Sequence, residues 1–259
     1  MKAIILAAGF GSRLMPLTKN NPKCMVKYQN EELISYEIKA LKEAGIFDIA
    51  VVGGYLSNIL KEFIKDKFNL YNFYENKNYT HTNMVQTLFC AREFLQKCIK
   101  QKEDLIISYA DIIYFKDSIE KLMQAKDDLA IVIDKEWRKL WQKRFKNPLD
   151  DAETLKLDNK GFIKELGKKA KSYDEIEGQY IGLFKISANF LPSVLNFYDN
   201  LDKNIFYDGK DFNNMYMTSF LQALIDTFNN AKAIEIYGNW CEIDFKSDLE
   251  VQINEDKTN

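Results

Sequence analysis

Apolar and polar positions alternate along the first part of the chain in a way that predicts strands and helices in turn. The apolar run from Lys2 to Ala8 predicts a buried strand, and the glycines after it predict a flexible loop. Apolar residues at helical spacing between Glu32 and Ala44 predict an amphipathic helix. Ile49 to Val52 is typical of a second buried strand, and Ile59 to Phe68 of a second helix. This order indicates a parallel α/β sheet.

The same alternation continues as far as residue 111. We expect a short strand from Leu70 to Tyr74, a helix from Asn83 to Lys100 and a buried strand from Leu105 to Ser108. Parallel sheets bind ligands beyond the carboxyl ends of their strands. Gly9 to Gly11, Gly53 to Gly54 and Asp111 all follow predicted strands. We therefore expect the chemistry at that edge of the sheet.

The pattern changes after Asp134. A helical stretch with Trp137 and Trp141 on one face comes first. Two strands, Glu153 to Leu157 and Phe162 to Leu166, flank a predicted hairpin turn, and residues 164 to 171 suggest a loop. Further strands are expected at 180–186 and 233–236, with helices at 188–201 and 215–226. Nothing in the pattern requires a second domain, so we expect one domain over residues 1–259.

Composition narrows the function classes. With 46% hydrophobic and 29% charged residues and a net charge of −2, the chain suits a globular protein rather than a disordered or nucleic-acid-binding one. The apolar run at the start is too short for a membrane span or a signal peptide. Four scattered cysteines without a CxxC pair suggest neither disulfides nor a zinc cluster. These features predict a cytoplasmic protein with no membrane or nucleic-acid partner.

The loop after the first strand carries the most informative chemistry. Gly9 and Gly11 would let backbone N–H groups approach phosphate oxygens closely. The guanidinium of Arg13 could bind a triphosphate through two hydrogen bonds, and Lys23 could add a mobile positive charge. A glycine turn with incidental basic residues is the plainer alternative. An anionic ligand explains all of these residues together.

This segment resembles the nucleotidyltransferases that activate a phosphorylated small molecule with a nucleoside triphosphate, whose signature is GxGxRxxPxTxxxPK. The resemblance implies an α/β Rossmann-like nucleotidyltransferase fold with a mostly parallel central sheet and a small β-containing acceptor-binding insertion. It also implies a nucleotide-binding half, residues 1–134, and an acceptor-binding half, residues 135–259. The signature residues here are Gly9, Gly11, Arg13, Pro16, Thr18, Pro22 and Lys23.

Later landmarks follow the family's order. Asp111 and Asp244 resemble its two Mg²⁺-binding aspartates, although either residue alone would more often cap a helix or sit in a turn. The resemblance assigns catalytic roles to Lys23 and Arg13. The nucleotide-binding residues that it implies are Leu6, Ala7, Ala8, Gly9, Gly11, Ser12, Arg13, Lys23, Tyr79, Thr82, Asn83 and Ala110.

The middle of the chain resembles the phosphocholine and phosphonate cytidylyltransferases more than the sugar branch. Asn83 suits the edge of a cytosine, but Thr82 and Asn83 would serve equally well as helix caps. The two tryptophans of the helical stretch could line a pocket for a cation, although such a stripe more often belongs to the core. The acceptor-binding residues that the resemblance implies are Trp137, Arg144, Lys168, Glu177, Gln179 and Tyr180.

The resemblance implies a Mg²⁺-dependent reaction in which an acceptor phosphate attacks the α-phosphorus of CTP and pyrophosphate leaves. L-Glutamine phosphate, giving CDP-L-glutamine for capsular phosphoramidate modification, is the expected acceptor. Phosphocholine, aminoethylphosphonate and a sugar 1-phosphate are the alternatives. A nucleotide-binding regulatory module without turnover is a further alternative. The only histidine, His81, has no second histidine with which to build a metal site.

Overall fold

The computed structural model describes residues 1–253. Within that range a seven-stranded sheet has the order β12-β8-β11-β6-β1-β4-β5. All of its strands run in the same direction except β11, which pairs antiparallel with β6 and β8. The predicted mostly parallel α/β sheet is therefore confirmed. The strands are β1 (Lys2–Ala7), β4 (Ile49–Gly53), β5 (Asn72–Glu75), β6 (Leu105–Tyr109), β8 (Leu129–Asp134), β11 (Gln179–Ile186) and β12 (Ala231–Ile236).

Helices cover both faces of this sheet. Because successive side chains of a strand point to opposite faces, Ile5 of β1 packs on one face while Ile4 packs on the other. The Ile5 face is covered by α1 (Leu33–Glu43), α2 (Ser57–Phe68), α5 (Lys116–Gln124) and α6 (Trp137–Arg144). The Ile4 face is covered by α3 (Met84–Cys90), α4 (Arg92–Gln101), α7 (Leu191–Asp199) and α8 (Met217–Phe228).

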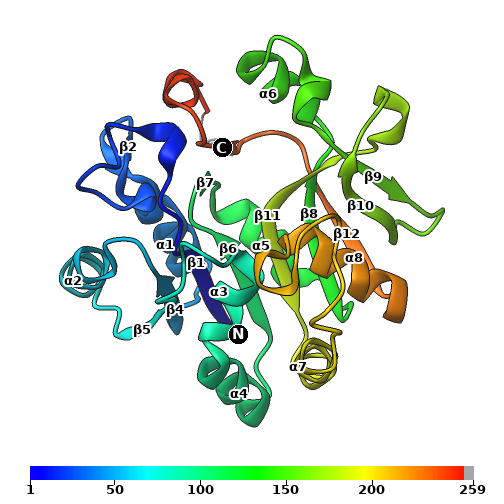
Figure 1. Ribbon diagram of the computed structural model, residues 1–259, viewed down its shortest axis with the longest axis horizontal. Coiled ribbons are helices and arrows are strands. Elements are labelled where there is room, and N and C mark those ends of the chain that lie inside the picture. The colour runs from blue at the N-terminus through cyan, green and yellow to red at the C-terminus, as the bar shows by residue number, and fades with distance from the viewer. Residues whose placement is uncertain (254–259) are drawn as a thin grey trace.

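Three small antiparallel pairs lie outside the main sheet. They are β2 (Lys27–Tyr28) with β3 (Glu31–Glu32), β9 (Glu153–Leu157) with β10 (Ile163–Lys169), and β7 (Ile112–Ile113) with β13 (Cys241–Glu242). Figure 1 shows the N-terminus at the lower edge of the sheet and the C-terminal segment crossing the upper edge beside β7. The β7–β13 pair therefore brings the end of the described chain to the carboxyl end of β6.

Several predicted elements differ from the observed ones. The helix expected from Asn83 to Lys100 is two helices, because the backbone leaves helical geometry at the buried Ala91. Residues 164–169, expected in a loop, extend β10. The β9–β10 pairing shifts register twice, which hides the alternation that marks a strand. The predicted strand at 70–74 begins only at Asn72, and β8 and α5 had no predicted counterpart.

Candidate active site

The loop after β1 is shaped by Gly11. Its φ of +67° is left-handed, and a Cβ there would lie 2.8 Å from the Cβ of Lys23. Glycine is therefore required for two reasons. The left-handed backbone favours it, and a larger side chain would collide with the aliphatic part of Lys23. The hydroxyl of Thr18 donates to the Gly11 carbonyl at 3.0 Å, which holds the loop against the start of the lysine segment.

A first cavity of about 160 Å³ opens at the carboxyl ends of β1 and β6. It collects nine of the predicted nucleotide-binding residues and the predicted metal ligand Asp111. Gly11 and Ser12 line neither this cavity nor the second one described below, and Ser12 is exposed in the loop. The lining residues are Leu6, Ala7, Ala8, Gly9, Lys23, Cys24, Tyr79, Thr82, Asn83, Met84, Thr87, Tyr109, Ala110 and Asp111.

Of the two residues offered as helix caps, only Asn83 caps the helix that follows. The Asn83 Oδ1 accepts from the amide of Met84 at 2.8 Å and so caps α3. The Thr82 hydroxyl donates to the Asn78 carbonyl at 2.9 Å. Both residues nevertheless line the first cavity. The cap at Asn83 and the hydrogen bond of Thr82 therefore hold both side chains at the wall of this cavity.

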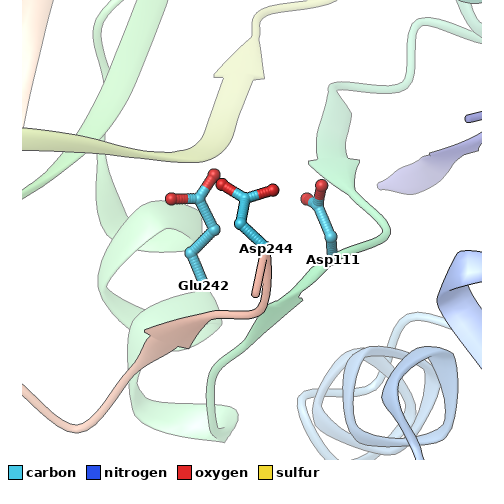
Figure 2. A group of neighbouring side chains, drawn as sticks. All are labelled: Asp111, Glu242 and Asp244. Carbon is cyan, nitrogen blue, oxygen red and sulfur yellow. The ribbon is translucent and has the colours of Figure 1, made fainter. Parts of the chain in front are cut away.

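Three carboxylates converge at the boundary of the cavity. Asp111 lies between β6 and β7, Glu242 belongs to β13, and Asp244 follows it. The amide of Ile243 donates to the Asp111 carbonyl at 2.8 Å, which joins the two segments. One oxygen from each carboxylate lies within 4.8 Å of the others. Figure 2 shows all three groups turned toward the same space.

Glu242 was missed by the sequence analysis. It stands two residues before Asp244, and in an extended segment such residues share a face. That alternation is the signal that could have found it. Three hard oxygen donors so close together fit a divalent cation of the Mg²⁺ type.

Two of the cations that contact these carboxylates, Lys23 and Arg13, also line the cavities. The Lys23 Nζ lies 2.6 Å from Asp111 Oδ2 and 2.8 Å from Asp244 Oδ1, and Arg13 contacts the same Asp244 oxygen at 2.5 Å. Burial by itself would lower the pKa of Lys23, but attraction to the two aspartates outweighs it and raises that pKa. Burial and repulsion from Asp244 raise the pKa of Glu242. The predicted basic residues and metal aspartates therefore form one charged group.

A second, larger cavity of about 860 Å³ adjoins the carboxylates. Met84 and Tyr109 line both cavities, and Arg13, Glu242 and Asp244 line the second. It is closed by the β9–β10 hairpin, the start of β11 and the start of α8. Its other lining residues are Trp141, Asp151, Glu153, Gly167, Lys168, Lys169, Gln179, Tyr180, Ile181, Gly182, Asp208, Tyr216, Met217, Thr218 and Trp240.

Three predicted acceptor residues, Lys168, Gln179 and Tyr180, line this cavity. The other three predicted residues do not line it. Trp137 is 5% exposed and packs against the rings of Trp141 and Tyr173, so it belongs to the core.

Arg144 is fully buried behind the carboxylates, where its guanidinium is held by ion pairs and lines neither cavity described here. Glu177 is exposed and accepts a hydrogen bond from the amide of Leu157 at 3.0 Å, because β9 passes beside it.

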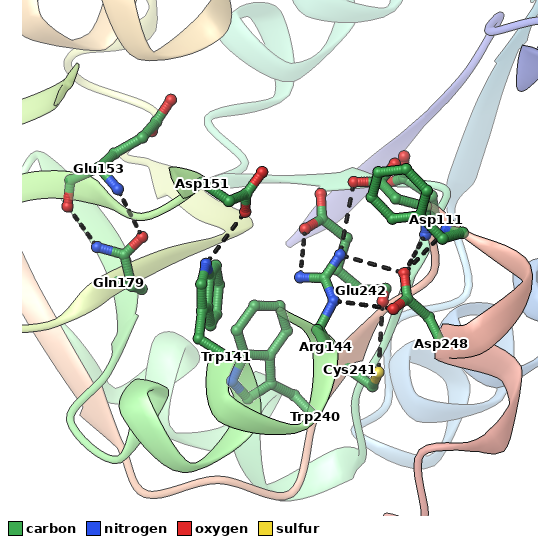
Figure 3. Close-up of polar contacts among 12 residues, drawn as sticks. Asp111, Trp141, Arg144, Asp151, Glu153, Gln179, Trp240, Cys241, Glu242 and Asp248 are labelled. Carbon is green, nitrogen blue, oxygen red and sulfur yellow. Dashed lines mark hydrogen bonds and ion pairs between the residues drawn. The ribbon is translucent and has the colours of Figure 1, made fainter. Parts of the chain in front are cut away.

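One wall of the second cavity is acidic. It is formed by Asp151, Glu153 and Asp208, which we call the acidic wall. Trp141 Nε1 donates to Asp151 Oδ2 at 3.0 Å, and Gln179 bonds the backbone of Glu153 (Figure 3). Burial first, and then repulsion from the other two carboxylates, raise the pKa of Glu153 to about 7. A positively charged ligand group would be stabilised here.

Comparison with known proteins places this geometry in context. The family model described as nucleotidyl transferase matches residues 2–139. The chain is 66% identical over 253 residues to the CTP:phosphoglutamine cytidylyltransferase of Campylobacter jejuni, covering 98% of this chain and 99% of that protein. It is 42% identical over 95 residues to the choline-phosphate cytidylyltransferase of Streptococcus pneumoniae, covering 37% of this chain and 41% of that protein.

Solved structures agree with this result. The CTP:phosphocholine cytidylyltransferase from Streptococcus pneumoniae superposes with a TM-score of 0.73 at 25% identity, covering 96% of each chain. The inositol-1-phosphate CTP transferase from T. maritima has the same TM-score at 20% identity, covering 95% of this chain and 90% of that one, and supports the fold alone. With a family model over half of the chain and a full-length relative at high identity, this chain belongs to the nucleotidyl transferase family.

Proposed function

We propose that this enzyme transfers CMP from CTP to L-glutamine phosphate and releases pyrophosphate. The observation that carries the proposal is the 66% identity over nearly the whole chain to the phosphoglutamine enzyme of Campylobacter jejuni. An acceptor phosphate oxygen bonds to the α-phosphorus of CTP, and the bond from that phosphorus to the β-phosphate bridging oxygen breaks. CDP-L-glutamine and pyrophosphate result, and no proton needs to be abstracted.

The first cavity is the proposed CTP site. Gly9, Thr82 and Asn83 lie in its wall, with Thr82 and Asn83 facing the base. The rest of the glycine loop and Arg13, which contacts Asp244 and lines the second cavity, extend the proposed triphosphate site beyond this cavity. Lys23 neutralises charge at the α-phosphate, and its contacts with Asp111 and Asp244 place it at the boundary between the cavities. Such preorganised charge is typically the largest contribution of an enzyme to this kind of transfer.

Asp111, Glu242 and Asp244 are the proposed ligands of Mg²⁺. When bound, the ion supplies positive charge that offsets the phosphates. The carboxylates themselves orient the ammonium of Lys23 and the guanidinium of Arg13 before substrates arrive. Glu242 is added here to the two aspartates that the family resemblance implied.

The second cavity is the proposed acceptor site. Its acidic wall suits the α-ammonium group of L-glutamine phosphate, and Lys168 suits an anionic group. We also propose that residues 1–134 form the nucleotide-binding half and 135–259 the acceptor half of a single domain. The first cavity is lined only by residues of the earlier half, whereas most of the second comes from the later half.

The cellular setting is part of the proposal. We place the enzyme in the cytoplasm, as a source of CDP-L-glutamine for capsular phosphoramidate modification, with no nucleic-acid partner. Its four cysteines are free, which suits a reducing compartment. Within residues 1–253, no helix combines the length and apolarity needed to cross a bilayer.

Phosphocholine is the second candidate acceptor. The acidic wall, with Trp141, Tyr216 and Trp240 in the same cavity, would also suit a quaternary ammonium group. A choline-phosphate cytidylyltransferase is among the relatives, although it matches only 37% of this chain.

Pyrophosphate release tests the proposal. The purified protein is incubated with Mg²⁺, either CTP or UTP, and L-glutamine phosphate, phosphocholine, aminoethylphosphonate or glucose 1-phosphate. We expect turnover with CTP and L-glutamine phosphate at a kcat/KM at least about tenfold above every other pair. A preference for phosphocholine would replace the acceptor, and turnover with glucose 1-phosphate would overturn the cytidylyltransferase branch. Silence with every pair would support a binding module without turnover.

A further inference from the structure

Arg144 contacts the carboxylate group from a position that lines neither described cavity. Its guanidinium lies 3.0 Å from Glu242 Oε2, 3.6 Å from Asp244 Oδ2 and 3.3 Å from Asp248 Oδ1. The side chain is fully buried. Figure 3 shows the guanidinium between Glu242 and Asp248 at the end of α6. One cation therefore contacts two proposed metal ligands and a further buried carboxylate.

Asp248 connects this arginine to the backbone of the site. It is fully buried, and its Oδ2 accepts from the amides of Asp244 and Phe245, both at 2.9 Å. The turn that carries Asp244 is thereby tied to the same carboxylate that the arginine holds. A substitution at Arg144 would therefore alter the position of Asp244 in two ways, through the direct contact and through this turn.

The charges of the site show why this cation differs from the others. Four carboxylates, of Asp111, Glu242, Asp244 and Asp248, meet three cations, Arg13, Lys23 and Arg144. Arg13 and Lys23 each line a cavity and can turn to phosphates, whereas Arg144 lines neither described cavity. Its ion pairs with Glu242 and Asp248 therefore lie outside the described cavities that substrates would enter.

The contact pattern requires an arginine. A planar guanidinium offers five N–H donors in a rigid fork and can address several carboxylates at once. The stem is also enclosed, because the guanidinium carbon lies 5.3 Å from the centre of the Trp141 ring and 5.1 Å from that of Phe145. A lysine would keep the charge but would lose the fork.

We propose that Arg144 is a positioning residue that sets the affinity of the active site for its divalent cation. It does so by holding Glu242 directly, and Asp244 both directly and through Asp248. This inference rests on the proposed role of Asp111, Glu242 and Asp244 as metal ligands. It replaces the acceptor contact that the sequence suggested for Arg144.

Metal binding without substrates tests the inference. Mn²⁺ is titrated into the full-length protein, and free Mn²⁺ is followed by its electron paramagnetic resonance signal. Residues that orient metal ligands typically contribute about 10–100-fold to metal affinity. We therefore expect Arg144→Gln to weaken Mn²⁺ binding at least about tenfold and Arg144→Lys to weaken it less. Excess metal should restore much of the kcat of Arg144→Lys, a rescue that a general loss of structure would not allow.

Lys143→Gln is the matched control, because it removes an exposed cation from the neighbouring position of the same helix. Its Mn²⁺ affinity should equal that of the unchanged protein. Wild-type Mn²⁺ affinity in a folded Arg144→Gln protein would overturn the inference. If that variant lacks a cooperative melting transition, Arg144→Lys decides, and wild-type affinity there would overturn it equally. Absence of Mn²⁺ binding by the unchanged protein would instead refute the proposed metal ligands themselves.

Discussion

Lys23 shows how much of the site depends on one side chain. Its stem passes beneath Gly11, and its ammonium bridges a carboxylate beside β6 and another near the end of the described chain. Attraction to the two carboxylates keeps it charged in spite of burial. A lysine held in this way can offset charge that develops at the α-phosphate.

We expect Lys23→Met to lower kcat about 10²-fold or more while changing the affinity for CTP little. Methionine keeps an apolar side chain of similar length, so the decrease in kcat measures the contribution of the positive charge of Lys23. Steady-state pyrophosphate release measures it, with Lys19→Met as the exposed control from the same loop. A near-normal kcat would remove Lys23 from the proposed mechanism.

Glu153 carries a stability cost that depends on pH. Its pKa is about 7 in the folded protein and 4.5 as the ordinary value, so between these pH values the folded state binds more protons than the unfolded one. The free energy of unfolding therefore falls as pH rises from 4.5 to 7, by about 3 kcal/mol at most.

We expect Glu153→Gln to raise the free energy of unfolding at pH 8 and to leave it nearly unchanged at pH 4.5. Urea unfolding at the two pH values measures the difference. Glu165→Gln is the control of opposite sign, because the hydrogen bond from Lys168 lowers the pKa of Glu165. If Glu153→Gln did not raise the free energy of unfolding at pH 8, the pKa of Glu153 would not be raised by burial and repulsion as described. A raised KM for the acceptor should accompany the gain in stability.

At the scale of elements, the shape of the proposed acceptor cavity depends on how the β9–β10 hairpin meets α8. Gly167 of β10 has a φ of +85°, and a Cβ there would lie 2.4 Å from the Cβ of Thr218 in α8. Both residues line the second cavity. The hairpin can approach the helix only with glycine at this position.

We expect Gly167→Ala to raise the KM for the acceptor more than the KM for CTP. The variant should also lower the free energy of unfolding by more than the cost of placing alanine in a left-handed backbone conformation. Gly45→Ala is the matched control. Its φ is +86°, but a Cβ there would meet nothing within 4 Å, so it should cost only about 1–2 kcal/mol. Equal losses in the two variants would show that the contact with α8 is unimportant.

At the scale of the whole molecule, the site joins distant parts of the chain. The loop after β1, the end of β6, α6 and the segment around β13 meet at one group of charges. A ligand that contacts several of these parts stabilises the folded state, because the unfolded chain does not present them together.

We expect CTP with Mg²⁺, at about 100 times its Kd, to raise the free energy of unfolding by about 2.7 kcal/mol. For a chain of this size that corresponds to about 5–10 °C in Tm. Differential scanning fluorimetry measures the shift, with UTP and Mg²⁺ as the nucleotide control. An equal shift with UTP would contradict selection of the cytosine base in the first cavity.

The sequence by itself determined the alternating strands and helices of the first 110 residues and the loop that carries Gly11, Arg13 and Lys23. Both depend on local information, namely apolar periodicity and the spacing of residues in one short segment. Asp111 and Asp244 could be placed by their order in the family, although 133 positions separate them in the chain. The mostly parallel sheet followed from the same alternation.

Only the tertiary structure decided which way the later side chains point. Glu242 joins the proposed metal ligands because β13 pairs with β7, and a shift of one residue in that pairing would turn it away. Arg144 faces the carboxylates and Trp137 the core because of how α6 packs, and Glu177 turns outward beside β9. Pairing and packing between distant segments leave no local pattern in the sequence, so these roles became visible only in the fold.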